Sequence, residues 1–205
     1  MTLILTFKHP PIDLSFLSKY NFEQIDDLTY KLVSKANGKP ITSINDSAFF
    51  QCTSLESIVI PNFVKTIGNY AFYECTSLKS IIIPYSVKNI GFCAFSYCTS
   101  LESIVIPDSV ISIQKDVFYN CASLESVVIP DSVKTIGNYA FSYCTSLESV
   151  VIPDSVISVQ EDIFSNCPSL KTVIINGQTI EYLKEYFETN YPEIDLEFPD
   201  QYLLK

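Results

Sequence analysis

The segment AFYECTSLKSIIIP at residues 71–84 decides the fold of this chain, because close copies of it recur along the sequence. Each copy holds one cysteine, and six cysteines stand 23 residues apart: Cys52, Cys75, Cys98, Cys121, Cys144 and Cys167. A fixed period of this size with an L-x-x-I-x-I core is typical of one structural unit copied in tandem. Such units stack on one another, so the sequence predicts a repeat solenoid.

Aligning the copies on the cysteine shows which positions should face the interior. One Phe and one Leu recur in every copy: Phe49, Phe72, Phe95, Phe118, Phe141 and Phe164, and Leu55, Leu78, Leu101, Leu124, Leu147 and Leu170. The next segment, 57–60 in the first copy, alternates with period two and is rich in β-branched residues, which predicts a short strand. Ile58 and Ile60 should point inward, and Ser57 and Val59 outward.

Proline follows the predicted strand in five copies, at Pro61, Pro84, Pro107, Pro130 and Pro153. Because proline has no backbone donor for a sheet ladder, it ends the strand. A second apolar pair then lines the opposite wall of the coil: Val64 and Ile67, Val87 and Ile90, Val110 and Ile113, Val133 and Ile136, Val156 and Val159. The next turn holds Gly68, Gly91 or Gly137 in three copies but Gln114 or Gln160 in two. Since glycine reaches backbone angles that glutamine resists, we expect these turns to differ locally.

This pattern resembles the leucine-rich repeat family, specifically the BspA-like class with its A-F-x-x-C-x-x-L-x-x-I-x-I-P-x-S-V-x-x-I-G motif. The resemblance covers about residues 41–176, in six copies. It implies a right-handed superhelix or horseshoe of short parallel β-strands, composed mostly of strand and turn. Where other leucine-rich repeats carry an asparagine ladder, this chain has Ser86, Ser109, Ser132 and Ser155, with Phe63 in the same column. We expect these hydroxyls to satisfy turn amides.

We predict three regions: an N-terminal cap at residues 1–40, six 23-residue repeats at 41–176, and a helical and acidic C-terminal cap at 177–205. Caps are expected because the end coils of a solenoid need covering. The N-terminal cap should hold a helix at 11–17 and a strand at 28–33. The C-terminal helix should run from Thr179 to Asn190 with Ile180, Leu183 and Phe187 on its apolar face. Docking of a partner is the alternative role for this helix.

The column of six cysteines predicts buried thiols that act as small apolar side chains. Disulfides are the alternative, because column neighbours would lie close together, although their Cβ vectors would run parallel. The seventh cysteine, Cys93, is out of phase. There is no C-x-x-C motif, and the single histidine, His9, lies outside the repeats, so we predict no metal site and no cofactor.

The chain is acidic, with 13 lysines and no arginine against 23 aspartates and glutamates, which gives a net charge of -10. Nucleic acids are bound through Lys and Arg, so we predict no nucleic-acid partner. No apolar run reaches the roughly 18 residues of a membrane span. The apolar run at residues 1–7 has no basic residue before it and no cleavage site after it, which argues against a signal peptide. We therefore expect a cytoplasmic protein whose thiols stay reduced, with the cell surface, reached by a non-classical route, as the alternative.

Outward strand positions form the predicted partner-binding surface, a stripe on the concave face of the sheet. Its members are Ser57, Val59, Ser80, Ile82, Ser103, Val105, Ser126, Val128, Ser149, Val151, Thr172 and Ile174. Contiguous exposed apolar surface commonly marks a protein partner site, although the same residues are also good strand formers. Acidic columns flank the stripe at Glu102, Glu125, Glu148, Asp108, Asp131 and Asp154. They would suit a basic partner, but duplication of the repeat alone also produces such columns.

Aromatic residues form a further candidate surface on the convex side. They are Phe50, Tyr73, Tyr97, Tyr119 and Tyr143, together with Tyr70, Phe92 and Tyr139. Tyrosine is favoured at interfaces, and packing between coils explains these rings equally well.

Catalytic motifs are missing from the sequence. His9 is the only imidazole and no phosphate-cradling glycine loop occurs, so we predict that the chain is not an enzyme. The predicted function is a non-catalytic protein–protein interaction module with a preformed concave sheet surface. The resemblance implies the same, since such repeats serve as recognition surfaces, and it adds one alternative: a cell-surface adhesin that binds a host or matrix protein. A structural component of a larger assembly, joined through the acidic C-terminal segment, is the other alternative. The partner and the oligomeric state are left open.

Overall fold

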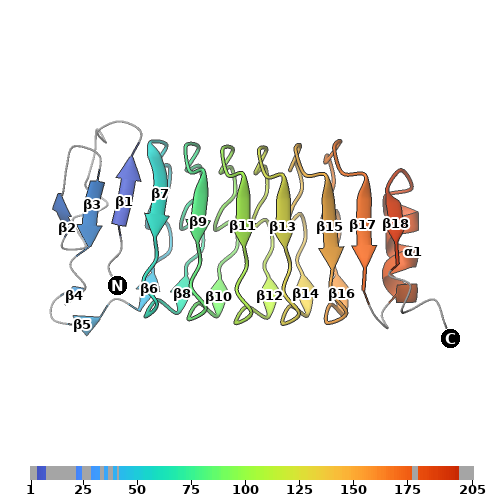
Figure 1. Cartoon of the computed structure of the whole chain (residues 1–205), viewed down its shortest axis with the longest axis horizontal. Coiled ribbons are helices and arrows are strands. Elements are labelled where there is room, and N and C mark those ends of the chain that lie inside the picture. The colour runs from blue at the N-terminus through green and yellow to red at the C-terminus, as the bar shows by residue number, and fades with distance from the viewer. Residues whose placement is uncertain are drawn as a thin grey trace.

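The computed structural model of the chain describes residues 4–7, 22–24, 29–32, 35–36, 39–40, 42–176 and 180–198. Figure 1 shows a long row of stacked coils whose strands lie side by side along the longest axis of the molecule. The predicted repeat solenoid of short parallel strands, built mostly of strand and turn, is therefore confirmed.

The main sheet has ten strands in the order β18-β17-β15-β13-β11-β9-β7-β1-β3-β2. Each repeat contributes one strand: β7 (Leu55–Val59), β9 (Ser80–Ile82), β11 (Ser103–Val105), β13 (Ser126–Val128), β15 (Ser149–Ile152) and β17 (Thr172–Ile175). These strands are parallel and in register at the repeat spacing, so Ser103 pairs with Ser126 and Val105 with Val128. Because the register equals the repeat, equivalent side chains of successive coils stand next to one another.

Antiparallel strands extend the main sheet at its N-terminal end. β1 (Ile4–Phe7) pairs antiparallel with β7 and with β3 (Thr29–Leu32), and β3 pairs with β2 (Phe22–Gln24). A small antiparallel pair, β4 (Lys35–Ala36) and β5 (Lys39–Pro40), precedes the repeats. The predicted strand at 28–33 is confirmed, while the predicted helix at 11–17 lies outside the described residues.

The opposite wall of the coils carries shorter strands, which form two sheets. The first, in the order β10-β8-β6, holds β6 (Ser43–Ile44), β8 (Thr66–Ile67) and β10 (Asn89–Ile90); the second, β12-β14-β16, holds β12 (Ser112–Ile113), β14 (Thr135–Ile136) and β16 (Ser158–Val159). The apolar pairs predicted for this wall are buried in every copy. The ladder is interrupted between β10 and β12, where a coil with Gly91 meets a coil with Gln114. Gly137 and Gln160 also meet, but β14 and β16 remain paired, so the change of residue alone does not explain the interruption.

The interior is a set of continuous side-chain columns, as predicted. Successive Phe rings from Phe49 to Phe164 lie nearly parallel, with centroids 5.1–5.7 Å apart. The cysteine column is buried from Cys75 to Cys144 and partly buried at its two ends, Cys52 and Cys167, and all seven cysteines are free thiols. Each column thiol from Cys75 onward also donates a hydrogen bond to the Phe carbonyl of the preceding coil, 3.1 Å from Cys75 Sγ to the Phe49 oxygen. The cysteine is thus both a small apolar side chain and a link between coils.

The serine column acts differently from our expectation. Ser86, Ser109, Ser132 and Ser155 donate their hydroxyl protons to the carbonyl oxygens of Val64, Val87, Val110 and Val133 in the preceding coil. The distance is 2.6 Å from Ser86 Oγ to the Val64 oxygen. These hydroxyls therefore connect coil to coil as donors, whereas the sequence suggested that they would accept from turn amides.

The sequence-based prediction that glycine is used at this turn for its backbone angles is also wrong. None of the three has a left-handed φ; instead, a Cβ on Gly91 would lie 2.5 Å from the Asn69 nitrogen of the preceding coil. Left-handed φ angles occur at two non-glycine positions in each coil, for example 54° at Tyr70 and 56° at Glu74. Among the described residues these positions are Ser47, Gln51, Tyr70, Glu74, Cys93, Tyr97, Asp116, Asn120, Tyr139, Tyr143, Asp162 and Asn166. The glycines provide close approach, and the turns take their shape from other residues.

The C-terminal segment continues the stack without repeating its sequence. Helix α1 (Ile180–Asn190) confirms the predicted helix, although its expected first residue and the side chain of Ile180 lie outside what the structure describes. Leu183 and Phe187 are buried, and the Phe187 ring lies 6.0 Å from that of Phe164 as the next member of the Phe column. After the helix, β18 (Asp195–Glu197) pairs parallel with β17.

Hydrogen bonds at this end replace those of a further coil. The Phe141 nitrogen donates to the Ile163 carbonyl of the next coil, at 3.0 Å, and the Phe164 nitrogen donates instead to the Tyr191 hydroxyl, at 3.1 Å. The Tyr186 hydroxyl in turn donates to the Gln160 carbonyl at 2.7 Å. Residues 180–198 therefore pack against the Phe164 ring and hydrogen-bond with backbone groups of the last repeat that have no further coil beside them.

Candidate interaction surface

The predicted stripe lies on the outer face of the main sheet, and its apolar members are most exposed in the middle. The exposed fraction is 76% for Ile82, 64% for Val105 and 61% for Val128, against 39% for Val59 and 40% for Val151. Ile174 is half-buried. The β-branched side chains thus form one continuous row across β9, β11, β13 and β15.

The polar members of the stripe follow the same trend. Ser80, Ser103, Ser126 and Ser149 are exposed, whereas Ser57 and Thr172 are half-buried. The ends are partly covered because further strands adjoin them: β1 pairs with β7, and β18 pairs with β17. The accessible part of the stripe therefore spans four strands.

Carboxylates stand at both ends of the three central strands of this face. Glu102, Glu125 and Glu148 immediately precede β11, β13 and β15, and Asp108, Asp131 and Asp154 follow the prolines after them. All six side chains are exposed. At each end of the run a lysine takes the glutamate position: Lys79, which lies 3.3 Å from Glu56, and Lys171. The part of the apolar row on β11, β13 and β15 is therefore bordered by negative charge.

Sequence analysis missed three exposed apolar side chains. Tyr85 is 75% exposed and follows the proline after β9, so it adds an aromatic ring beside the stripe. Ile111 and Ile157 are 64% and 63% exposed and lie outside the main sheet, just before β12 and β16. The signal for them was in the repeat itself, since the other copies place Lys65, Lys88 and Lys134 at this position.

The aromatic residues at the turns form a row that zigzags between two sequence columns. Ring centroids are 5.1 Å apart for Phe50 and Tyr73, 5.4 Å for Tyr73 and Tyr97, 5.5 Å for Tyr97 and Tyr119, and 5.2 Å for Tyr119 and Tyr143. In the third and fifth coils the ring comes one residue later and a buried serine, Ser96 or Ser142, takes the earlier place. Tyr73, Tyr97 and Tyr119 are half-buried, so much of this row packs between coils.

The buried thiols are held protonated at neutral pH. Burial raises the pKa of Cys52 to about 12 and that of Cys167 to about 11, and it also raises the pKa of Cys75, Cys98, Cys121 and Cys144. Because the thiolate is the reactive form, these cysteines are poor nucleophiles and poor metal ligands. Their role is structural.

The described residues form neither a cluster of metal ligands nor a membrane-spanning helix. Across these residues no three His, Cys, Asp or Glu side chains gather in a way that could hold a metal ion. The same part of the chain contains no helix with both the length and the apolar character that crossing a bilayer requires.

Solved structures of bacterial leucine-rich repeat proteins are similar to this chain. The T. pallidum leucine-rich repeat protein TpLRR is 29% identical, with a TM-score of 0.68 over 89% of this chain and 98% of that one. A leucine-rich cell surface protein from Faecalibacterium prausnitzii A2-165 is 30% identical, with a TM-score of 0.54 over 75% of this chain and 45% of that one. The pneumococcal vaccine antigen PcpA, 20% identical, shares the fold with a TM-score of 0.59 over 94% of this chain and 50% of that one. This chain thus spans about half the length of the latter two. A search of curated protein sequences gave no match.

The repeats themselves also match a family model. The model of the BspA type leucine rich repeat region fits residues 15–125 and 111–202, with six copies, which is more than half of the sequence. The chain belongs to the BspA type leucine-rich repeat family.

Proposed function

We propose that this chain is a non-catalytic protein-interaction module that binds its partner with the outer face of the main sheet. The observation that supports this most strongly is the exposed row of Ile82, Val105 and Val128, each more than half exposed. Isolated exposed apolar residues are ordinary, but a contiguous exposed apolar row commonly marks a partner site.

The rigidity of the face favours binding. Its strands are paired in register on both sides, and the Phe and cysteine columns fix the coils beneath them. A preformed surface loses little conformational entropy when a partner docks, so more of the contact free energy appears as affinity.

The border of carboxylates favours a particular kind of partner. Glutamates and aspartates stand at both ends of β11, β13 and β15, and the whole chain carries a net charge of -10. A partner with an apolar centre and a basic rim would match this arrangement, and the charges would speed its association.

An adhesin is the second candidate, with the same face binding a host or matrix protein. It is supported by the similarity to the Faecalibacterium prausnitzii structure, which is described as a leucine-rich cell surface protein. The two candidates predict different locations, the cytoplasm for an intracellular partner and the cell surface for an adhesin. Treating intact cells of the native source with protease separates them, since only an adhesin would be digested.

A structural role through the C-terminal segment has less support. The apolar side chains Leu183 and Phe187 of α1 are buried within this chain. They are therefore engaged by its own last coil, whereas the acidic side chains Glu185 and Glu188 are exposed, so a contact through the acidic segment stays the third candidate.

The test is affinity capture with a matched pair of variants, followed by mass spectrometry. Val105→Glu/Val128→Glu places two charges in the stripe, and Ile111→Glu/Ile157→Glu places two charges on similarly exposed residues outside the main sheet. We expect proteins retained by the wild type and by the Ile111/Ile157 control to be lost from the stripe variant. Retention of the same proteins by all three would refute the stripe as the recognition surface.

A further inference from the structure

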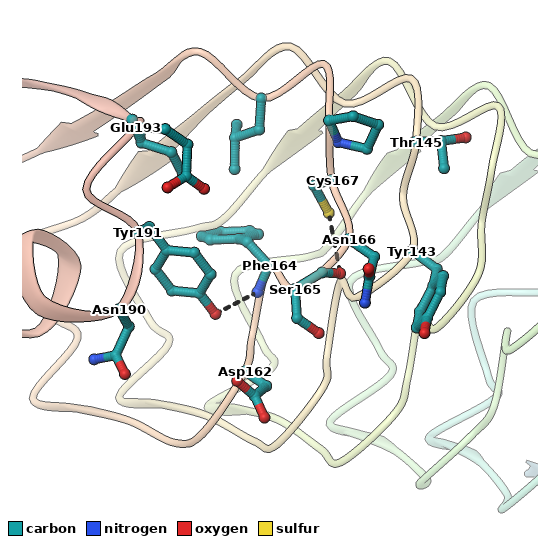
Figure 2. A pocket seen from close by; sticks show the side chains of 13 residues that line it. Tyr143, Thr145, Asp162, Phe164, Ser165, Asn166, Cys167, Asn190, Tyr191 and Glu193 are labelled. Carbon is teal, nitrogen blue, oxygen red and sulfur yellow. Dashed lines mark hydrogen bonds between the residues drawn. The ribbon is translucent and has the colours of Figure 1, made fainter.

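A pocket of about 580 Å³ lies where the solenoid ends, between the last coil and the segment after α1 (Figure 2). Residues from 162–170 form one side, 190–194 the other, and Tyr143 and Thr145 of the preceding coil complete it. None of these residues belongs to the stripe on the main sheet. We propose that this pocket binds the arginine side chain of a partner polypeptide.

The pocket exists because the aromatic row stops at Tyr143. Each earlier ring of the row is followed by another ring 5.1–5.5 Å away in the next coil. The coil after Tyr143 has Ser165 and Asn166 at the two ring positions, and both line the pocket. Tyr143 is 40% exposed, so a flat group can pack against its ring at the place where the next ring would have stood.

The negatively charged lining of the pocket favours a positively charged ligand. Asp162 and Glu193 both line the pocket, and its lining includes no Lys, Arg or His. Figure 2 shows the two carboxylates on opposite sides of the Phe164 ring in that view. The side-chain oxygens of Asn166 and Asn190 add neutral acceptors to the same lining.

A guanidinium group fits these features better than an ammonium group. It is planar, so it stacks on an aromatic face, and its N–H groups pair with a carboxylate in bidentate fashion. Lysine presents a compact point charge and lacks both properties. The apolar part of the lining, with Phe164, Leu170 and Ile194, can receive the aliphatic stem.

A polypeptide other than these 205 residues must supply the occupant. The 205 residues contain no arginine, so neither they nor a second copy of them can supply the guanidinium group. The volume lies within the range of about 300–1,000 Å³ that is common for ligand pockets, which leaves room for the stem and for backbone beside it.

The test follows backbone amide signals of the full-length, ¹⁵N-labelled chain at low ionic strength. The probe is the peptide acetyl-Gly-Arg-Gly-amide, and the comparison peptide replaces arginine with citrulline, its uncharged isostere. We expect saturable shifts confined to residues 143–145, 162–170 and 190–194, with citrulline binding about tenfold more weakly or worse. Equal binding of both peptides, shifts spread over the acidic surface, or no shift at all would overturn the proposal.

A matched pair of variants separates the pocket from general electrostatic attraction. Asp162→Asn/Glu193→Gln removes both pocket carboxylates, while Asp116→Asn/Glu188→Gln removes two carboxylates elsewhere and leaves the same net charge. Asp116 is a suitable control because its φ of 55° equals that of Asp162. We expect the pocket variant to bind the arginine peptide about tenfold more weakly and the control to stay within about twofold of the wild type. Equal losses in the two variants, with spectra that are otherwise unchanged, would contradict the assignment.

Discussion

At the scale of single residues, the coil is constrained most tightly where the backbones of neighbouring coils meet. Gly68, Gly91 and Gly137 stand at such contacts, and a Cβ at any of them would lie 2.4–2.7 Å from a backbone nitrogen of the preceding coil. At the equivalent place two coils carry Gln114 and Gln160 instead. The repeat therefore places either glycine or glutamine at this turn, and Gln160 keeps the same backbone hydrogen bond to the preceding coil as Gly137, 2.9 Å in each case.

Gly91→Ala tests this contact. The added Cβ meets backbone atoms, which cannot move aside as a flexible side chain would, so we expect a loss of about 2 kcal/mol in the free energy of unfolding. Urea denaturation followed by circular dichroism measures it. Gln114→Ala is the control and should change stability by less than about 0.5 kcal/mol, because the Gln114 side chain is exposed. Equal effects of the two substitutions would show that Gly91 is not sterically required.

Because burial raises the pKa of the column thiols, we predict that the protein loses stability in alkaline solution. An unfolded cysteine loses its proton near pH 8.5, whereas burial raises the pKa of the native thiols, to about 12 for Cys52. Above pH 8.5 the native state therefore holds more protons than the unfolded state, and stability falls as pH rises. Each buried thiol should lower the free energy of unfolding by up to about 1.4 kcal/mol per pH unit.

Denaturant titrations between pH 8 and pH 10.5 measure this slope. Cys98→Ala/Cys121→Ala should show a shallower decline than the wild type, whatever its stability at pH 7, because two of the titrating groups are gone. All other ionisable groups are common to both proteins, so their contributions cancel in the comparison. Identical slopes would mean that the column thiols do not control the alkaline limit.

At the scale of structural elements, the Phe column holds successive coils together. Phe118 is fully buried, with its ring 5.7 Å from that of Phe95 and 5.3 Å from that of Phe141. Phe118→Ala leaves a cavity in a central coil and should cost about 3–5 kcal/mol, measured by chemical denaturation. A loss below about 1 kcal/mol would show that the stack carries little of the stability.

We propose that the C-terminal element acts as a cap, because it makes the contacts that a seventh coil would make. Tyr191→Phe removes the hydroxyl that accepts the Phe164 N–H and leaves a buried donor without its partner. We expect a loss of about 1–3 kcal/mol and faster amide exchange at Phe164, measured by NMR. Tyr186→Phe removes the hydrogen bond to the Gln160 carbonyl, which is exposed, and should cost less. If both substitutions were neutral, the hydroxyls would not be part of the cap.

The 23-residue period continues into the C-terminal element, which the sequence analysis did not recognise. Phe187 stands 23 residues after Phe164, and Leu196 stands 23 after Val173, its partner in the sheet. The helix between them hid the continuing period, because 180–190 shows helical rather than strand spacing. The left-handed turn positions gave only a weak signal. Asp and Asn, which adopt that backbone conformation more readily than other non-glycine residues, occur there in two coils, but Tyr, Glu and Cys occupy the same positions in other coils.

At the scale of the whole molecule, the 23-residue period was enough to predict the architecture. It determined the parallel register, the buried columns and the outward stripe, because equivalent residues of identical units must stand side by side. The antiparallel strands β1, β2 and β3 and the terminal pocket lie where the period ends or changes, and no repeat could predict them. The fold and the stripe follow from the repetition, whereas the antiparallel strands and the terminal pocket lie at its ends.

The most direct test of recognition by the main-sheet face is calorimetry with a captured partner. Titrations at several temperatures should give a negative change in heat capacity, because the apolar stripe leaves water on binding. Val105→Glu/Val128→Glu should abolish the binding or reduce both affinity and heat-capacity change, and Ile111→Glu/Ile157→Glu should leave both unchanged. Unaltered binding by a correctly folded stripe variant would contradict the account.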